Sequence, residues 1–236
     1  MNQTIVEDLV TGSHILANEG VLDGLGHISV RHPDNPQRYF MSRALAPALV
    51  MPSDIMEYDL DSDAIDRQGR ALFLERFIHG ETYKARADVM AVVHSHSPTV
   101  IPFSISRTPL RPVFNGAAFL SPSAPVFDIR KVAGMTDLLI GNGELGKALT
   151  LTLGHAAVAL LRGHGNVVVG ETVQHVVYRA IQTELNARLQ LQAVMLDGPL
   201  IYLAQEEAVK VNARSGPEAT QIARTWELWK QRIPGQ

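Results

Sequence analysis

The sequence predicts an α/β fold in which helices flank a mixed sheet. Uninterrupted apolar runs bounded by polar or turn residues are typical of central strands that are buried on both faces. Three such runs occur, at 89–93, 156–161 and 167–169. Segments with helical periodicity lie around them, and no internal repeat, low-complexity tract or linker interrupts the chain. We therefore expect a single α/β domain over residues 1–236.

The first third of the chain is expected to contain one helix and three strands. Gly20 ends a helical apolar pattern, and the turn residues at 33–36 separate two short β-favouring segments that predict a hairpin. The expected segments are a helix at 5–19, strands at 27–30, 38–41 and 54–61, and a loop at 61–70.

Helices are expected to dominate the rest of the chain, apart from one passage rich in proline. The prolines within 109–125 predict mostly loop structure over 110–132. Thr172 is a suitable first residue for a long helix, and Gly198-Pro199 is a suitable stop. The expected helices are 75–86, 144–152 and 172–194, followed by two amphipathic helices that finish the chain.

Composition argues against two classes of partner. The formal net charge of −3 provides no cationic field for nucleic acid. No apolar run approaches the roughly 20 residues of a membrane span, and acidic Glu7 and Asp8 stand where a signal peptide carries basic residues. We therefore expect a cytoplasmic protein without nucleic-acid or membrane partners. A small anionic substrate remains possible through local arginines.

Histidines are the natural place to look for a metal site, because the chain has nine of them and no cysteine. Side chains alternate along a strand, so His94 and His96 are expected to share one face at the end of a buried strand. His164 lies between two glycines after another apolar run and is the best third ligand. A purely structural role for the histidine pair is the alternative. A cupin-type barrel is disfavoured because residues 97–107 contain no acid.

Several nearby residues have two possible roles. Glu75 is either a general acid/base or metal ligand, or simply an acid at a helix start. His79, one helical turn later, is either a partner behind the site or a packed core histidine. Arg43 and Arg76 are candidates to bind an anionic group, although a lone arginine is more often only solvated.

Taken together, these residues resemble the class II aldolase/adducin family over nearly the whole chain. The resemblance rests on four segments, Gly26–Arg31, Glu75 with His79, Val92–His96, and Arg162–Gly165 with Gly170. It implies a three-layer α/β/α fold with a mixed, largely antiparallel sheet. It also implies a divalent metal held by His94, His96 and His164, and Glu75 as catalytic acid/base. Members are commonly tetramers with sites at subunit interfaces, so a homotetramer is expected.

Departures from the sugar-phosphate aldolases narrow the expected reaction. Those enzymes carry Gly-Asn in the first loop and Ser-Ser before the catalytic glutamate, whereas this chain has His27 and Phe73-Leu74. Losing these phosphate ligands favours a flat, partly apolar substrate. The segments 42–47 and 74–81 are similar to the branch that decarboxylates hydroxypyridine-dicarboxylates and dihydroxyphthalates.

The expected function is therefore that of a metal-dependent, non-oxidative decarboxylase of a hydroxylated aromatic (di)carboxylate. An aldolase or epimerase of a non-phosphorylated sugar acid is the first alternative, and a non-catalytic adducin-like interaction module is the second. Manganese or zinc is expected first as the metal, then cobalt or iron. The residues expected to bind substrate are His27, Ser42, Arg43 and Arg76.

Overall fold

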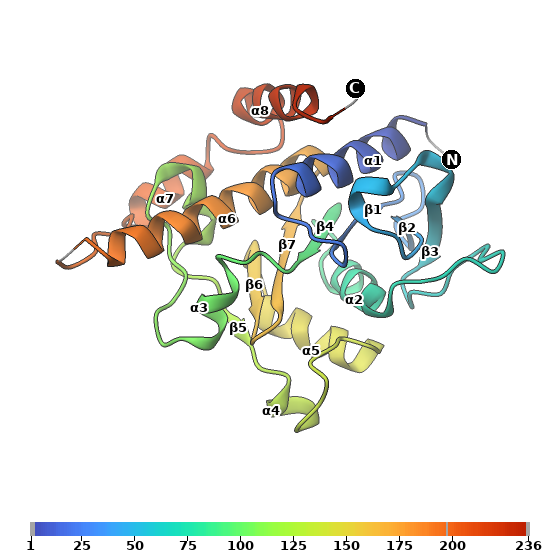
Figure 1. Cartoon of the computed structure of the whole chain (residues 1–236), viewed down its shortest axis with the longest axis horizontal. Helices are drawn as coiled ribbons and strands as arrows, with labels where there is room; N and C mark the ends of the chain where they lie inside the picture. Colours follow the sequence, from blue (N-terminus) through green and yellow to red (C-terminus); the bar gives the residue numbers. More distant parts are fainter. Residues whose placement is uncertain (1–2, 197, 235–236) are drawn as a thin grey trace.

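A seven-stranded sheet separates two helical layers in the computed structural model, which describes residues 3–196 and 198–234 (Figure 1). The strand order is β3-β2-β1-β4-β7-β6-β5, and every neighbouring pair is antiparallel except β5 and β6. The expectation of a mixed, largely antiparallel sheet is therefore confirmed. The strands are β1 His27–Arg31, β2 Arg38–Ser42, β3 Ile55–Asp59, β4 Ala91–Ser95, β5 Val126–Phe127, β6 Val158–Leu161 and β7 Gly165–Gly170.

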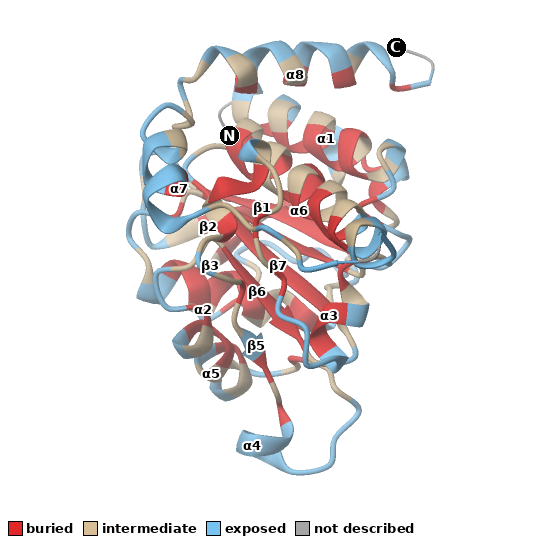
Figure 2. Cartoon of the chain, turned by 90° about the vertical axis from the view of Figure 1, so that its left-hand side faces the viewer, coloured by how far each residue is buried: buried red, intermediate tan, exposed pale blue. Residues whose placement is uncertain are grey.

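Helices cover both faces of the sheet (Figure 2). Helices α1 and α6, with α8 packed against α6, lie over one face, and α2 and α5 lie over the other. The α-helices are α1 Gln3–Asn18, α2 Phe77–Ala85, α3 Ile101–Ile105, α4 Arg130–Ala133, α5 Gly143–Leu153, α6 Val173–Val194, α7 Gln205–Asn212 and α8 Thr220–Gln231. In the described part of the chain, none of these helices combines the length and apolar composition that crossing a bilayer requires.

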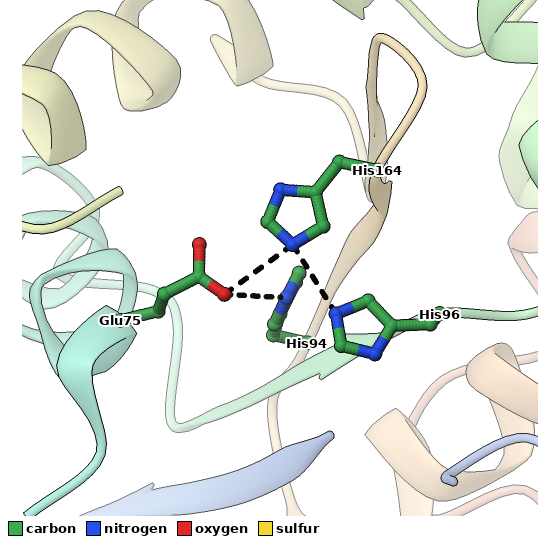
Figure 3. A group of neighbouring side chains, drawn as sticks. All are labelled: Glu75, His94, His96 and His164. Carbon is green, nitrogen blue, oxygen red and sulfur yellow. Dashed lines mark hydrogen bonds and ion pairs between the residues drawn. The ribbon is translucent and has the colours of Figure 1, made fainter. Parts of the chain in front are cut away.

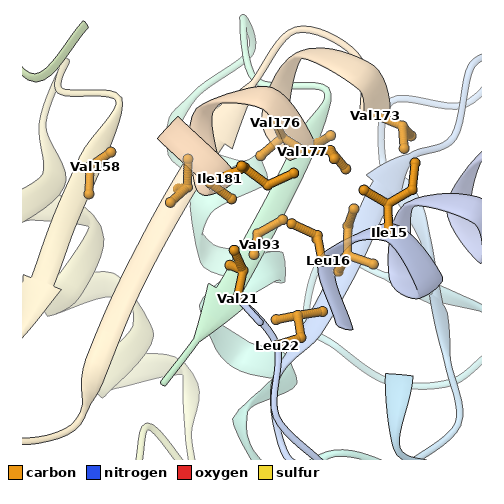
Figure 4. Close-up of a cluster of buried hydrophobic side chains, with 14 of the residues drawn as sticks. Ile15, Leu16, Val21, Leu22, Val93, Val158, Val173, Val176, Val177 and Ile181 are labelled. Atoms are coloured by element: carbon orange, nitrogen blue, oxygen red, sulfur yellow. The ribbon is translucent and has the colours of Figure 1, made fainter. Parts of the chain in front are cut away.

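The two-residue period of the central strands sorts their side chains between two cores. In β4, Val93 packs among the side chains of α1 and α6 (Figure 4), whereas Val92 faces the opposite cluster with α2 and α5. β7 behaves in the same way, with Val168 on one side and Val167 on the other. The apolar runs are uninterrupted because both faces of these strands are covered by helices.

Most predicted elements are present, with shifted boundaries. The first helix, the hairpin, the third strand and the two closing helices are confirmed, and the first buried run ends as a strand two residues later than expected, at Ser95. The loop-rich passage also contains β5 and a 3₁₀ turn at Asn115–Leu120. These pieces are too short to produce a periodic signal.

The helix predicted to begin at Glu75 begins instead at Phe77. Glu75 lies in a 3₁₀ turn, Leu74–Arg76, with non-helical φ −88° and ψ 18°. The prediction was wrong about the start because the tertiary contacts of the Glu75 carboxylate, rather than helix propensity, decide its backbone conformation. Glu75 is therefore not an acid in the first turn of α2.

Candidate metal centre and its cavity

Three histidines and one glutamate meet where β4 and the β6–β7 hairpin end (Figure 3). His94 is the fourth residue of β4, and His96 follows the strand. His164 lies in the turn between β6 and β7, and β7 pairs directly with β4. One ligand atom from each histidine and from Glu75 lies within 4.8 Å of all the others. The predicted grouping of the three histidines is therefore what the fold produces.

Glycines allow this close approach of the two chain segments. Gly163 has φ +63°, a left-handed conformation that glycine adopts without steric cost. A Cβ at Gly165 would lie 2.1 Å from the carbonyl oxygen of Ser95. Only glycine therefore lets β7 reach the end of β4 and place His164 beside the other two imidazoles.

Each of the three imidazoles is oriented by an oxygen acceptor at its Nδ1. His94 Nδ1 donates to the Asn166 carbonyl at 3.1 Å, and His164 Nδ1 donates to the Leu138 carbonyl at 3.0 Å. His96 Nδ1 lies 3.0 Å from Oδ2 of Asp23. With the proton on Nδ1, the lone pair of each Nε2 is directed to the shared centre. The Nε2 atom of His94 is buried without a hydrogen-bond partner.

Glu75 supplies a carboxylate to the same centre. Its Oε1 accepts a hydrogen bond of 2.8 Å from the Ile140 amide, and its Oε2 lies 3.4 Å from Nε2 of His94 and 3.3 Å from Nε2 of His164. Burial would raise the pKa of Glu75, but the contacts with His164 and His94 outweigh it and hold that pKa below its usual value. The carboxylate is therefore ionised and held in place.

The donor set fits a divalent metal ion. It offers three imidazole nitrogens and a carboxylate oxygen with no thiolate, a combination that manganese, zinc, cobalt and iron all accept. Metal ligands require free lone pairs directed to one point, and the unpartnered Nε2 of His94 and the convergence of the three Nε2 atoms meet this requirement. His94, His96 and His164 would hold the ion, with Glu75 beside it.

A cavity of about 570 Å³ opens onto this centre. Its walls combine the Glu75 and histidine side chains with apolar groups, chiefly Phe73 and a run of leucines. Such a mixture of apolar walls and a few polar groups is typical of small-molecule sites. The lining residues are Asp23, Leu25, His27, Phe73, Leu74, Glu75, His96, Asp137, Leu138, Leu139, Gly163 and His164.

His27 enters the site through strand register. β1 pairs with β4 so that His27 lies directly opposite His94, and their ring centroids are 5.2 Å apart. The ring of Phe73 lies 4.5 Å from His27 on the cavity side. Burial, followed by the neighbouring His79 and His94, holds the pKa of His27 well below its usual value. His79 is fully buried behind His27, so it acts as a partner behind the cavity as well as a packed core histidine.

The other three candidates for substrate binding do not line this cavity in the single chain. Ser42 is buried at the end of β2. Arg43 pairs with Asp54 at 2.7 Å. Arg76 donates to the carbonyls of Ser62 and Phe73. Their role as substrate ligands stays a prediction.

Sequence reasoning missed the groups that orient the ligands. Two of them, the carbonyls of Asn166 and Leu138, belong to the backbone and leave no trace in residue identity. Asp23 lies in the loop before β1, far from His96 in sequence, and only the fold brings the two side chains together. The amide of Ile140 reaches Glu75 in the same way.

Comparison with known proteins agrees with this geometry. Residues 7–191 match the family described as Class II Aldolase and Adducin N-terminal domain. The chain belongs to this family. Both the predicted family and the predicted fold are thereby confirmed.

Relatives with curated names include decarboxylases. The chain is 38% identical to decarboxylase tropJ of Talaromyces stipitatus, over 97% of this chain and 93% of that protein. It is 29% identical to a 3,4-dihydroxyphthalate decarboxylase of Arthrobacter keyseri, over 94% of this chain and 92% of the relative. Among solved structures, an L-fuculose 1-phosphate aldolase from Glaciozyma antarctica superposes with a TM-score of 0.79 at 24% identity, covering 97% of this chain and 89% of that chain. That structural similarity concerns the fold.

Proposed function

We propose that this protein is a metal-dependent, non-oxidative decarboxylase of a hydroxylated aromatic carboxylate. One observation carries the proposal. The cluster of Glu75 and three histidines opens onto a cavity whose walls include Phe73 and several leucines. Two relatives that match most of this chain bear decarboxylase names, one of them for a dihydroxyphthalate. A dihydroxyphthalate or hydroxypyridine-dicarboxylate is the proposed kind of substrate.

A divalent ion, when bound, supplies positive charge that stabilises the electrons left on the substrate when carbon dioxide departs. Glu75 has the complementary task of moving the proton. Its ionised carboxylate accepts the proton of the substrate hydroxyl and returns it to the ring carbon that loses the carboxylate. The amide of Ile140 holds Oε1 in place, so Oε2 is the atom that carries the proton. Phe73 and Leu74 provide apolar walls that keep water from the reacting carbon once a neighbouring subunit covers Leu74.

The complete site is proposed to lie between subunits of a homotetramer. The cavity lining contains neither lysine nor arginine among the described residues. Leu25 is 69% exposed and Leu74 is 52% exposed, and two exposed leucines at the wall of one cavity suit a surface that another subunit covers. A neighbouring subunit would cover these leucines and add groups to the site.

The two alternatives differ from the proposed decarboxylase in their products, since an aldolase would form another product and an interaction module would form none. An aldolase acting on a non-phosphorylated hydroxy-carbonyl compound shares the same centre and would release an aldehyde. An adducin-like interaction module would not need residues that bind a metal ion. The presence of Glu75 and three oriented histidines in one cluster argues against such a module.

The test begins with metal analysis of the purified protein, followed by incubation with a panel of ortho-hydroxylated aromatic acids. We expect release of carbon dioxide in stoichiometric amounts with the decarboxylated phenol. If the protein forms an aldehyde from hydroxy acids and releases no carbon dioxide from any aromatic acid, the decarboxylase proposal is wrong and the aldolase alternative is supported. A protein that binds no metal and turns over neither class would favour the interaction module.

A further inference from the structure

A buried chain of hydrogen bonds runs from the cavity into the sheet. Nδ1 of His27 lies 2.7 Å from Nε2 of His79. Nδ1 of His79 lies 2.5 Å from Oγ of Ser29, and that oxygen lies 2.7 Å from the hydroxyl of Tyr83. All four side chains are at most 3% exposed. The chain has one end at the cavity, at His27, and the other end in the core, at Tyr83.

The core end determines the direction of every hydrogen bond. Among the hydrogen bonds of the described residues, the Tyr83 hydroxyl makes one, with Ser29 Oγ. Within the described residues, Ser29 Oγ is thus the acceptor available for the Tyr83 proton. A buried hydroxyl proton without an acceptor is costly, so Tyr83 donates to Ser29.

Each following bond then has one possible donor. The Ser29 proton also needs an acceptor, and because Tyr83 is the donor in the other contact of Ser29, this proton goes to Nδ1 of His79. His79 consequently carries its proton on Nε2 and donates it to Nδ1 of His27. Because Nδ1 of His27 accepts, the neutral ring of His27 must carry its proton on Nε2.

We propose that this chain locks His27 as an Nε2–H donor, and that this donor holds an anionic oxygen of the substrate. The inference rests on the proposed function and narrows its substrate class. His27 lies between His94 and the ring of Phe73, so a substrate oxygen next to the metal ligands and a substrate ring against Phe73 are both within its reach.

The charges around the cavity indicate which kind of anion can bind to the His27 donor. Asp23 and Asp137 line the cavity, and its lining has no cationic side chain in the described part of the chain. In the lining that this chain provides, a phosphate dianion would meet like charge without a compensating guanidinium or ammonium. Each carboxylate of a hydroxylated aromatic acid carries one negative charge, less than a phosphate dianion, and needs fewer donors. The inferred substrate class is an ortho-hydroxy aromatic carboxylate that lies flat against Phe73.

The first test determines which ring nitrogen of His27 carries the proton. Nitrogen-15 NMR of histidine-labelled, zinc-loaded protein distinguishes a protonated from an unprotonated ring nitrogen. We expect His27 to show a protonated Nε2 and an unprotonated Nδ1. In Tyr83→Phe, the fixed donor at the core end is lost, and we expect mixed protonation of His27. A protonated Nδ1 in the wild-type protein overturns the inference.

Tyr58→Phe is a matched control for Tyr83→Phe. Tyr58 is also fully buried on the same side of the sheet, and its hydroxyl contacts the sulfur of Met56 rather than the His27 chain. We expect Tyr58→Phe to leave the His27 nitrogen signals unchanged. An equal change in both variants would mean that general loosening of the core, and not the direction of the chain, alters His27.

The second test asks whether Nε2–H of His27 donates to a substrate anion. It measures the binding of salicylate to zinc-loaded protein by calorimetry. His27→Phe should weaken salicylate about 10- to 100-fold, because a hydrogen bond to an anion is lost. His27→Gln, which replaces the Nε2–H with an amide donor, should recover most of that affinity, and both variants should keep full zinc content. Equal affinity in wild type and His27→Phe overturns the role of His27 while leaving the decarboxylase proposal intact. No salicylate binding to wild type overturns the inferred substrate class.

Discussion

Asp23 holds His96 through a contact of 3.0 Å between its Oδ2 and the Nδ1 atom of the ring. The same carboxylate also caps the loop, because its Oδ1 accepts from the amides of Leu25 and Gly26. These loop contacts keep Asp23 in position even though its side chain is 46% exposed. Orientation of His96 thus depends on a residue that contributes no atom to the metal cluster itself.

Replacing Asp23 with alanine should weaken metal binding by about 10- to 100-fold, the usual effect of removing a group that orients a ligating histidine. Competition with a chromogenic chelator measures this affinity. Asp137→Asn is the matched control, because Asp137 also lines the cavity but its carboxylate accepts from the Leu139 amide rather than holding a histidine. Equal losses in the two variants would contradict a specific role for Asp23.

Glu75→Gln should keep the metal and lose turnover. Glutamine retains an oxygen for the Ile140 amide but cannot carry the proton, so we expect at least about a 100-fold lower kcat. Metal content by mass spectrometry should stay close to that of the wild type, whereas His94→Ala should lose the metal. A Glu75→Gln enzyme with normal turnover would refute the proton-transfer role.

Metal affinity should rise with pH. Burial opposes protonation of His164, but its hydrogen bond and charge interaction with Glu75 outweigh burial and raise its pKa above the usual 6.5 in the metal-free protein. A ligating histidine must be neutral, so protons compete with the metal below that raised pKa. For one displaced proton, the affinity falls about tenfold for each pH unit below it. Chelator titrations at several pH values give the slope, and a flat profile would contradict proton displacement.

Acid should destabilise the fold partly through His175 on α6. Burial, followed by the nearby Arg179, lowers the pKa of His175 to about 3. Between pH 6.5 and about 3 the unfolded chain binds a proton that the folded chain does not, so stability is present above 6.5 and is lost as pH falls. One such group contributes at most about 1.4 kcal/mol per pH unit to the slope.

Urea unfolding of the wild type and of His175→Gln at a series of pH values checks this expectation. The variant should lose less unfolding free energy between neutral and acidic pH than the wild type does. Its absolute stability at neutral pH provides the internal control for any packing defect. Parallel pH profiles for the two proteins would exclude His175 as a contributor.

Gly165→Ala should damage both the fold and the metal site. The added Cβ would lie 2.1 Å from the Ser95 carbonyl, so β7 must move away from β4. We expect a loss of several kcal/mol in unfolding free energy and a marked drop in metal content. Gly154→Ala is the comparison, since its closest neighbour is at 4.0 Å and it belongs neither to the metal cluster nor to the cavity lining, although its φ of +52° gives it some strain of its own. A Gly165→Ala protein that binds metal normally would contradict the close-packing argument.

The sequence by itself determined the outline of this protein. The apolar runs could be recognised as central strands because both of their faces are covered, and the alternation of a strand placed His94 and His96 on one face. The glycines around His164 indicated the tight turn that brings in the third imidazole. These features depend on spacing along the chain, which residue identities record directly.

Tertiary structure alone decided what surrounds the histidines. The irregular turn at Glu75, the carbonyls behind His94 and His164, and the carboxylate of Asp23 all depend on segments that meet only after folding. The register that sets His27 opposite His94, and the buried chain from His27 to Tyr83, have the same origin. Local sequence specifies which side of a strand a residue occupies. The hydrogen-bond partner on that side belongs to another element, so the packing of the layers decides whether the two residues meet.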